Sequence, residues 1–247
     1  MAFEQQPDEI RQKVVSLAEE AIQKQDPSSW FDTLYVDADG DTAKIPWARL
    51  TIHPYLQAWI TEEKITGNGS SALVIGCGLG DDAEALAKLG FQVTAFDVSP
   101  EAIAWCKKRF PDSEVNYLVA DLFALDPAWQ GKFCLVVESR TIQALPLSVR
   151  IEAIVAIASL VTFVEGKLVV ITRYRDTEAE PDGPPWALSE SELSRFHDCG
   201  LNEVRREEFV DEGRGVTELR LEYLKYPPTC GTGRIQVSSK RQKRRPK

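Results

Sequence analysis

The stretch ALVIGCGLGDD, residues 72–82, decides the fold of this chain. Its first four residues are an apolar run typical of a buried parallel strand. The glycines at 76, 78 and 80 then make a tight turn, and Asp81 and Asp82 open a helical pattern that continues through Leu86 and Leu89. A glycine loop at a strand-to-helix turn lets a ligand approach the backbone closely. The sequence therefore predicts a ligand-binding loop at residues 76–80.

The two acids after this loop indicate which ligand it holds. A dinucleotide places its pyrophosphate at the helix N-terminus, where free N–H groups and the helix dipole favour an anion. In this chain Asp81 and Asp82 already occupy that positive end. Two carboxylates repel a pyrophosphate and favour a cationic or zwitterionic ligand without phosphate. S-adenosylmethionine, which carries a sulfonium and an ammonium, fits this description.

Three further segments each end in an acid. Residues 92–97 end in Asp97, which lies 21 residues after Gly76, residues 115–121 end in Asp121, and residues 133–138 end in Glu138. The distance to Asp97 is typical of a carboxylate that binds two ribose hydroxyls, and an acceptor at Asp121 can bind an adenine amino group. Ligands of an open parallel sheet bind beyond the carboxyl ends of its strands. We therefore expect these residues to share one rim with Gly76.

Each of these signals also has a structural alternative. Any tight strand-to-helix turn needs glycine, so the loop alone is weak evidence for a ligand. Asp97 can simply precede a helix with Ser99 as its N-cap and Pro100 as its first residue. Asp121 can end a strand in a turn. The ordered set of signals favours a cofactor site over these separate readings.

With these four motifs, the sequence resembles class I S-adenosylmethionine-dependent methyltransferases over residues 45–225. It is most similar to the thiopurine methyltransferase-like branch, through GCGLGDD and the upstream IPWARLTIHPYLQAWI, whereas the fourth motif, VVESRTIQALP, departs from that branch. The resemblance implies that the loop backbone at Gly76, Cys77 and Gly78 faces the methionine part of the cofactor, while Trp47 packs against the cofactor. It also implies roles at the strand ends: Asp97 with Val98 at the ribose, Asp121 with the Leu122 amide at the adenine, and Glu138 beside the methionine amino group.

Strand and helix patterns alternate along the middle of the chain. Strands are expected at 72–76, 92–97, 115–120, 133–138 and 167–173, with helices at 81–89, 99–108 and 147–161 between them. This alternation predicts an α/β fold with a doubly wound, Rossmann-like sheet. EVRREEFV and GVTELRLEYL predict a C-terminal antiparallel hairpin, which completes the mostly parallel seven-stranded sheet that the resemblance implies. We expect N-terminal helices and a lid segment at 1–66, a methyltransferase core at 67–226, and a disordered basic tail at 227–247.

Residues 26–55 form the expected lid. Residues 30–48 lack a regular period and contain Trp30, Tyr35 and Trp47. Large aromatic rings need a surface to pack on, and an aromatic face attracts a sulfonium. The alternative is that these rings pack on the outer helices.

The charge of the chain disfavours nucleic acid as a partner. The net charge is −9, and the last eight residues carry six of the 29 basic side chains against 38 acidic ones in the chain. An acidic body repels phosphates and anionic membranes, although the tail itself is either a solvated extension or a contact site. No signal peptide or membrane span is expected. Five widely spaced cysteines without a CxxC pair favour a reduced, cytoplasmic protein without a metal site.

Methyl transfer from a sulfonium is an in-line displacement that needs alignment and the exclusion of water. A general base is needed only if the nucleophile arrives protonated, so no catalytic residue is assigned. Candidate substrate contacts are Tyr35, His53, Arg140 and Arg173, where His53 can equally be a packed side chain and the two arginines can pair with rim acids. The expected acceptor is a small molecule, such as a thiol, a thiopurine-like compound or a halide-like anion. Rival functions are a nicotinamide-dependent oxidoreductase and a non-catalytic cofactor-binding module.

Overall fold

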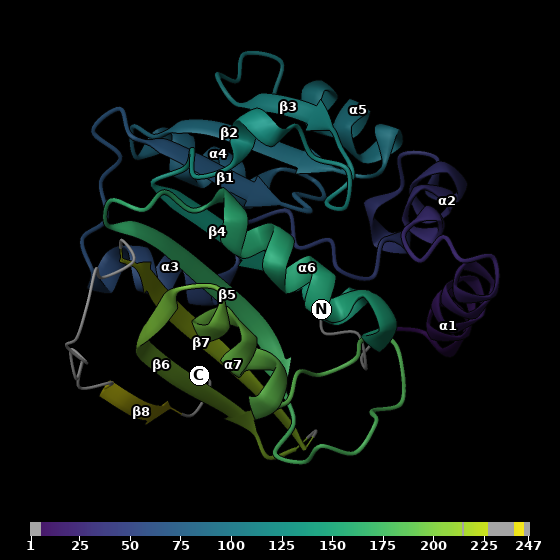
Figure 1. Ribbon diagram of the computed structural model, residues 1–247. Helices are drawn as coiled ribbons and strands as arrows, with labels where there is room; N and C mark the ends of the chain where they lie inside the picture. Colours follow the sequence, from purple (N-terminus) through teal and green to yellow (C-terminus); the bar gives the residue numbers. More distant parts are fainter. Residues whose placement is uncertain (1–5, 214, 227–239, 245–247) are drawn as a thin grey trace. The chain divides into compact units, whose positions relative to one another are not determined.

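The structure, a computed structural model, describes residues 6–213, 215–226 and 240–244, the last of these as backbone only (Figure 1). The chain divides into two compact units. The first unit holds residues 1–69 and 74–121, and the second holds residues 70–73 and 122–247. The division differs from the sequence-based one, because it groups the N-terminal helices with the glycine loop and the two strands that follow it.

The first unit consists of helices, the end of the first strand, and the second and third strands of the chain. Its elements are α1 (Asp8–Gln23), α2 (Ser29–Ala38), the 3-10 turn η2 (Thr42–Lys44), α3 (Pro54–Glu62), the last two residues of β1 (Ser71–Ile75), α4 (Asp81–Lys88), β2 (Gln92–Asp97), α5 (Pro100–Arg109) and β3 (Asn116–Val119). Within it the strand order is β3-β2-β1. The helices α4 and α5 contact β2, and α5 also contacts β3 (Figure 1).

The second unit carries the remaining strands. Its elements are η3 (Pro127–Trp129), β4 (Leu135–Ser139), η4 (Ile142–Ala144), α6 (Leu147–Leu160), β5 (Gly166–Tyr174), α7 (Glu190–Asp198), β6 (Leu201–Asp211), β7 (Val216–Lys225) and β8 (Lys240–Arg244). Its strand order is β4-β5-β7-β6-β8. The helix α7 contacts both α6 and β6.

Strand directions confirm the predicted α/β fold class. The pair β2 and β3 and the pair β4 and β5 are parallel, with Asp97 opposite Val119 and Glu138 opposite Val170. The strand β7 runs antiparallel to both β5 and β6, so the chain ends its Rossmann-like sheet with the expected hairpin. The sequence did not predict an eighth strand, yet β8 pairs parallel with β6. The rest of the predicted disordered tail, residues 227–239 and 245–247, lies outside the described residues.

Short polar signals set where several helices begin. The Ser99 hydroxyl accepts from the Ala102 N–H and Pro100 takes the first helical position, so α5 starts as its sequence indicates. Ser189 and Glu192 form the predicted capping box of α7, in which each side chain accepts from the other's backbone N–H. These local contacts fix the direction in which each helix leaves the preceding segment.

The core of each unit is apolar. In the first unit, one cluster of buried side chains joins α2 and the following turn to the glycine loop and α5; it consists of Tyr35, Ala38, Ile45, Leu79, Ala102 and Trp105. In the second unit, β4, β5 and β7 bury an aliphatic core that includes Val136, Val137, Leu168, Val169, Val170, Ile171, Leu219 and Leu221. No helix in the described part of the chain is long and apolar enough to span a membrane.

The expectation of an irregular segment at residues 30–48 was wrong for residues 30–38 and 42–44. Ser29–Ala38 form α2, and Thr42–Lys44 form a 3-10 turn. Trp30 and Tyr35 are buried, and Tyr35 meets Trp105 of α5 edge to face at 5.7 Å between ring centroids. The buried residues of this helix share one face, but the exposed Val36 puts an apolar residue on the opposite face, so the sequence shows no clear helical period.

Gly80 is a position where the fold requires glycine. Its φ is +87°, and a Cβ there would lie 2.5 Å from Tyr117 Oη and 3.2 Å from Cys106 Sγ. Gly200 has a similar φ of +81° but nothing within 4 Å of the same position. Both glycines adopt left-handed backbone, whereas only Gly80 is also enclosed by other side chains.

These two glycines allow a matched test. Gly200→Ala is expected to destabilise the protein by about 1–2 kcal/mol, the cost of left-handed backbone for a residue with a Cβ. Gly80→Ala is expected to cost about 1–3 kcal/mol more, because its methyl group also overpacks the loop. Urea denaturation of both variants measures the difference. Equal losses would show that Tyr117 and Cys106 move aside freely.

Candidate functional site

The glycine loop is tied to the end of β2 through its backbone. Gly76 and Gly78 have φ values of +56° and +53°. The Cys77 N–H donates to the Phe96 carbonyl at 2.9 Å, and the Gly78 N–H donates to Asp97 Oδ2 at 2.9 Å. A left-handed residue at 76 and again at 78 aims consecutive N–H groups at β2. The loop is therefore held open as a rigid cradle beside Asp97.

Asp97 lies where the sequence predicts an acid, at the last position of β2. Its carboxylate is buried, and besides Gly78 it accepts from the Ser99 N–H, through Oδ1 at 3.0 Å. Burial raises the pKa of Asp97, while the backbone N–H groups of Ser99, Gly78 and Val98 oppose that rise. Each carboxylate oxygen has two acceptor sites, so both oxygens keep capacity for a ligand hydroxyl. The carboxylate fits a ribose diol and also braces the loop.

Two aromatic side chains lie against the loop at Gly78. Trp47 Nε1 donates to the Tyr35 hydroxyl at 2.8 Å. A Cβ on Gly78 would meet the Tyr35 hydroxyl at 3.3 Å and the Trp47 ring at 3.9 Å. Burial, and then the charge of Asp97, raise the pKa of Tyr35 well above its ordinary value, so its hydroxyl stays protonated. The structure thus brings Tyr35, predicted at the substrate, and Trp47, predicted at the cofactor, to the same turn of the loop.

The sequence left two alternatives for these aromatic rings, packing over the cofactor or packing on the outer helices, and the structure has features of both. Trp30 and Phe31 of α2 each meet the Trp47 ring edge to face, at 6.0 and 5.9 Å between centroids. Tyr35 packs on α5, as the outer-helix alternative expects. Trp47 nevertheless reaches the glycine loop, as the lid expectation requires. Whether the segment closes on a ligand stays a prediction.

The two acids at the start of α4 have partners elsewhere in the first unit. Asp81 forms two bonds with the Arg109 guanidinium of α5, at 2.9 and 3.0 Å. Asp82 Oδ1 accepts from the His53 N–H at 2.7 Å. Arg109 neutralises Asp81, and Asp82 accepts a backbone hydrogen bond. The two acids are therefore not the free charges that the sequence analysis expected to repel a pyrophosphate. Their role here is to tie the start of α4 to α5 and to α3.

His53 has a structural function in the first unit. It is the N-cap of α3, its Nδ1 accepts from the Tyr55 N–H at 3.3 Å, and its own N–H binds Asp82. The side chain is 5% exposed. This is the packed histidine that the sequence left as the alternative to a substrate contact.

The adenine-side candidates follow β3 along the chain. Asp121 follows β3 and is half-buried, and Leu122 is buried. The Ala120 N–H donates to the Asp97 carbonyl at 3.1 Å, which places the segment before Asp121 at the end of β2. Asp121 therefore belongs with Asp97 and the glycine loop in the first unit.

Glu138 is the predicted acid of the second unit. It lies at the carboxyl end of β4 and is 0% exposed. Its Oε1 accepts from the Thr141 and Ile142 N–H groups at 2.6 and 3.0 Å. Burial raises the pKa of Glu138 to about 7, although the Ile142 and Thr141 N–H groups and the charge of Arg150 lower it. Oε2 is buried without a hydrogen-bond partner among the described residues.

The two rim arginines are engaged within the second unit. Arg140 has a φ of +67°, donates its N–H to the Ile171 carbonyl at 2.8 Å, and forms an ion pair with Glu218 through its guanidinium. Arg173 is buried, and its N–H donates to Gln143 Oε1 at 2.6 Å. The sequence left two alternatives for Arg140, a substrate contact or an ion pair with an acid, and the structure has the ion pair.

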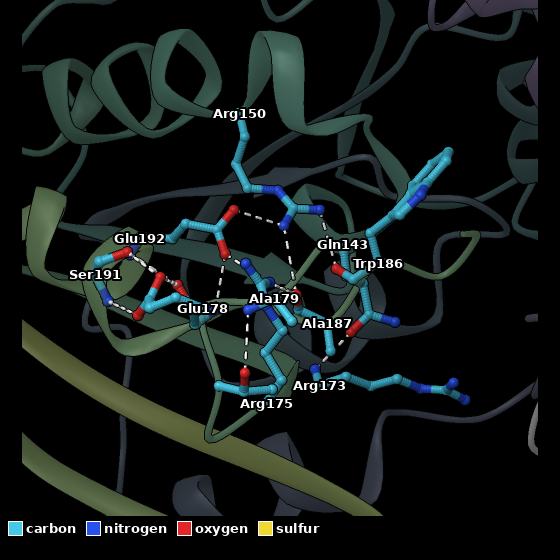
Figure 2. Close-up of polar contacts among 12 residues, drawn as sticks. Gln143, Arg150, Arg173, Arg175, Glu178, Ala179, Trp186, Ala187, Ser191 and Glu192 are labelled. Carbon is cyan, nitrogen blue, oxygen red and sulfur yellow. Dashed lines mark hydrogen bonds and ion pairs between the residues drawn. The ribbon is translucent and has the colours of Figure 1, made fainter. Parts of the chain in front are cut away.

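Sequence reasoning missed a buried polar network around Arg150 (Figure 2). Arg150 of α6 is 1% exposed; it donates to Glu192 at 2.7 Å and to the Leu145 and Trp186 carbonyls at 3.1 and 3.0 Å. Arg175 forms an ion pair with the other Glu192 oxygen at 2.8 Å. The network ties the segments that follow β4 and β5 to each other. The available signal was an arginine inside the largely apolar pattern LSVRIEAIVAIASL, whose other charged residue is Glu152.

Gln143 completes this connection in the second unit (Figure 2). Its carbonyl accepts from the Trp186 N–H at 2.7 Å, while its side chain accepts from the Arg173 N–H. The loop after β4 is therefore held on both sides, by the end of β5 and by the segment that contains Trp186. This loop is the one whose N–H groups orient Glu138.

The raised pKa of Glu138 predicts how Glu138→Gln changes the pH dependence of stability. The folded protein holds the proton up to about pH 7, whereas the unfolded chain releases it near pH 4.5. The stability that Glu138 contributes is therefore fully present below about pH 4.5 and is lost as the pH rises through 7. Relative to Glu138→Gln, the wild type should lose about 3 kcal/mol across this range. Urea denaturation at a series of pH values measures this change, and a constant difference would show that Glu138 has an ordinary pKa.

Three solved methyltransferase structures share the fold of this chain. The 1,6-didemethyltoxoflavin-N1-methyltransferase of Burkholderia thailandensis, solved with 1,6-didemethyltoxoflavin and S-adenosylhomocysteine, has a TM-score of 0.61 at 16% identity and covers 80% of this chain and 88% of its own. An N-methyltransferase of Bradyrhizobium japonicum WM9, solved with S-adenosylhomocysteine, has a TM-score of 0.59 at 21% identity and covers 78% of this chain and 99% of its own. The magnesium protoporphyrin IX methyltransferase of Synechocystis PCC 6803, solved with S-adenosylmethionine, has a TM-score of 0.59 at 16% identity and covers 80% of this chain and 94% of its own. At these identities the likeness shows the fold alone.

No curated protein matches the chain. Residues 38–225 of the chain match the thiopurine S-methyltransferase family. This range begins at the end of α2, includes the glycine loop and the acids of β2 and β4, and ends at the last residue of β7. Because the match extends over most of the sequence, the chain belongs to the thiopurine S-methyltransferase family.

Proposed function

We propose that this chain transfers a methyl group from S-adenosylmethionine to a small-molecule acceptor by direct in-line displacement. Family membership gives the reaction class, an S-adenosylmethionine-dependent methyl transfer. The observation that carries the site is the position of Gly78, between the Asp97 carboxylate and the Tyr35–Trp47 pair. A cofactor at this loop meets backbone, a carboxylate and aromatic rings within one short segment.

The residues of the glycine loop and of the segments that follow β2 and β3 fit this cofactor chemically. The glycines at 76 and 78 leave the loop backbone bare for the methionine part, with Cys77 between them. Asp97, with Val98 after it, offers acceptor sites for the ribose hydroxyls. Asp121 and the Leu122 N–H offer one acceptor and one donor for the adenine edge. When bound, the cofactor supplies a methyl group already activated by its sulfonium.

The Tyr35–Trp47 pair can contribute in two ways. The Trp47 ring, partly buried beside Gly78, presents an aromatic face to a cation, an attraction worth roughly 0.5–2 kcal/mol. The Tyr35 hydroxyl already accepts from Trp47 and has its own proton left to donate. A carboxylate of a bound amino-acid group near Gly78 is the partner that this proton fits. The pair therefore suits a ligand with both charges, such as the methionine part of the cofactor.

The acceptor class follows from weaker observations. The acidic body argues against nucleic acid, and the family suggests a thiol or thiopurine-like acceptor. The neighbouring structures are described as N-methyltransferases and a porphyrin methyltransferase, so they leave nitrogen and oxygen nucleophiles open as well. Arg173, at the end of β5, remains a candidate contact for such an acceptor. Arg140, which pairs with Glu218, is a candidate as well.

Ligand-induced stabilisation separates this function from a nicotinamide-dependent oxidoreductase. S-adenosylhomocysteine at 100 times its dissociation constant should stabilise the folded protein by about 2.7 kcal/mol, while NAD should give no shift. Release of a labelled methyl group to a panel of thiols, phenols and amines then separates an enzyme from a non-catalytic cofactor-binding module. Stabilisation without any transfer would support the non-catalytic alternative.

Tyr35→Phe tests the cofactor site directly. The change removes one hydroxyl beside Gly78, so we expect S-adenosylhomocysteine to bind about 2- to 10-fold more weakly by calorimetry, the value of one hydrogen bond. Tyr117→Phe is the matched control. Its hydroxyl is also next to the loop, at the Gly80 side, but donates to Glu84 at 2.8 Å. The control should lose stability and keep its affinity. Equal effects of the two changes on affinity would remove Tyr35 from the cofactor site.

A further inference from the structure

Asp32 joins α2 to the N-terminus of α5 within the first unit. Its Oδ1 accepts from the Ser99 hydroxyl at 2.6 Å and from the Glu101 N–H at 3.3 Å. The shorter distance is that of a strong hydrogen bond to an ionised acceptor, and Ser99 is 0% exposed, so water does not compete for the hydroxyl proton. A half-buried acid of the N-terminal segment is therefore bound to the residue that caps α5.

Ser99 connects this acid to Asp97. The Ser99 N–H donates to Asp97 Oδ1 at 3.0 Å, while the Ser99 hydroxyl oxygen accepts from the Ala102 N–H at 3.0 Å. A serine hydroxyl has a single proton, and here that proton goes to Asp32. Both donors of Ser99 are thus engaged, one with Asp97 and the other with Asp32. The position of the N–H that binds Asp97 therefore depends on Asp32.

This arrangement fixes the Asp97 carboxylate at a cost. Each of its oxygens accepts one backbone N–H, Oδ1 from Ser99 and Oδ2 from Gly78. Burial is the main cause that raises the pKa of Asp97, and the charge of Asp32 adds to the rise. Two acids that repel each other in one network cost stability, and such costs are typical of sites where a ligand completes the network. The hydroxyls of a ribose are donors that can do so.

Asp32 also lies on the side of α2 that meets the glycine loop. Tyr35 is three residues further along the helix, so the two side chains are neighbours on its surface. A Cβ on Gly78 would meet the Tyr35 hydroxyl at 3.3 Å. Asp32 can therefore act in two ways, by orienting Asp97 through Ser99 or by holding α2 against the loop. The place of the contact favours the first, since Ser99 is the residue whose N–H also binds Asp97.

We propose that Asp32 is a positioning residue of the cofactor site, which acts through Ser99 to hold the Asp97 carboxylate in the orientation that binds a ribose diol. This inference rests on the proposed function and deepens it, because it adds a residue that acts on the cofactor through another side chain. Hydrogen bonds weaken steeply when donor and acceptor are misaligned, so a carboxylate that binds two hydroxyls at once depends on its orientation. Asp32 should therefore matter for ligands that carry the diol and not for ligands that lack it.

The test compares S-adenosylhomocysteine with its 2′,3′-dideoxyribose analogue, which lacks both hydroxyls. Calorimetry gives the affinity of each ligand for the wild type, for Asp32→Asn and for the control Glu101→Gln. Asparagine keeps the shape of Asp32 and an oxygen for the Ser99 hydroxyl, while it removes the charge that strengthens this bond. Glu101 is a second acid at the N-terminus of α5, and it accepts from Trp105 Nε1 at 2.6 Å, a bond that glutamine can keep.

The wild type should bind S-adenosylhomocysteine at least about 10-fold more tightly than the analogue, the value of hydrogen bonds to a charged group. Asp32→Asn should lose about 3- to 10-fold of its affinity for S-adenosylhomocysteine and less than about twofold for the analogue, because only the diol needs the orientation of Asp97. Glu101→Gln should keep both affinities within about twofold, since it removes a charge from the same helix end and leaves the bond between Asp32 and Ser99 in place.

Ser99→Ala gives an independent measurement, and it takes the place of Asp32→Asn if that variant does not fold. The change removes the hydroxyl and keeps the N–H that binds Asp97, so the loss of affinity should again be confined to S-adenosylhomocysteine. In the double variant Asp32→Asn with Ser99→Ala, the two losses should not add, because both changes act on one hydrogen bond.

Several results would overturn the inference and leave the proposed function in place. Equal losses for both ligands in Asp32→Asn or Ser99→Ala would show that Asp32 only holds α2 against the loop. Unchanged affinities, or the same selective loss in Glu101→Gln, would show that Asp32 does not act through Ser99. A wild type that binds both ligands equally would remove Asp97 from the ribose. A wild type that binds neither ligand would overturn the proposed function together with the inference.

Discussion

The hydrogen bond from the Gly78 N–H to Asp97 Oδ2 is the contact on which the first unit depends. It joins the turn after β1 to the end of β2, and it forms only because the backbone at 76 and 78 is left-handed, a conformation that glycine adopts without strain. The same turn sets the start of α4, since Gly80 is its N-cap. One short loop therefore fixes two strands and a helix, and leaves bare backbone where they meet.

The carboxylate in this bond has both a structural and a chemical role. Asp97 braces the loop through one oxygen and the start of α5 through the other, by way of the Ser99 N–H. Burying a carboxylate costs several kcal/mol unless hydrogen bonds compensate for lost water, and the backbone donors here provide that compensation. Asp32 of α2 extends the arrangement, because it accepts from the Ser99 hydroxyl at 2.6 Å. The aromatic segment is thus linked to the acid that its rings lie beside.

The sequence predicted the parts of this arrangement that depend on neighbours along the chain. The glycine loop, the strand that ends in Asp97, the Ser99 cap and the Ser189–Glu192 capping box follow from local patterns, and the structure has them within one or two residues. Alternating strands and helices similarly gave the fold class, because the hydrophobic period of each segment is set by its own residues.

The features that sequence reasoning missed are made by residues far apart in the chain. Arg109 lies 28 residues from Asp81, and Arg150 lies 42 residues from Glu192. A pattern within one segment cannot show which distant charge will be its partner, so Asp81 was interpreted as a free acid at the ligand. The helix α2 was missed for a different reason. Its buried residues, which include Trp30, Leu34 and Tyr35, lie on one face, but the exposed Val36 puts an apolar side chain on the opposite face and obscures the helical period.

In the second unit, the contacts of the buried Arg150 explain the raised pKa of the buried Glu138. Arg150 is held by Glu192 and by two carbonyl oxygens, so its charge is compensated before it acts on Glu138. A carboxylate with a direct arginine partner would have a low pKa and could not exchange a proton near neutral pH. With Arg150 engaged elsewhere, burial dominates and the pKa of Glu138 rises to about 7. The network around Arg150 thus holds the loop after β4 in place and also leaves Glu138 able to bind and release a proton.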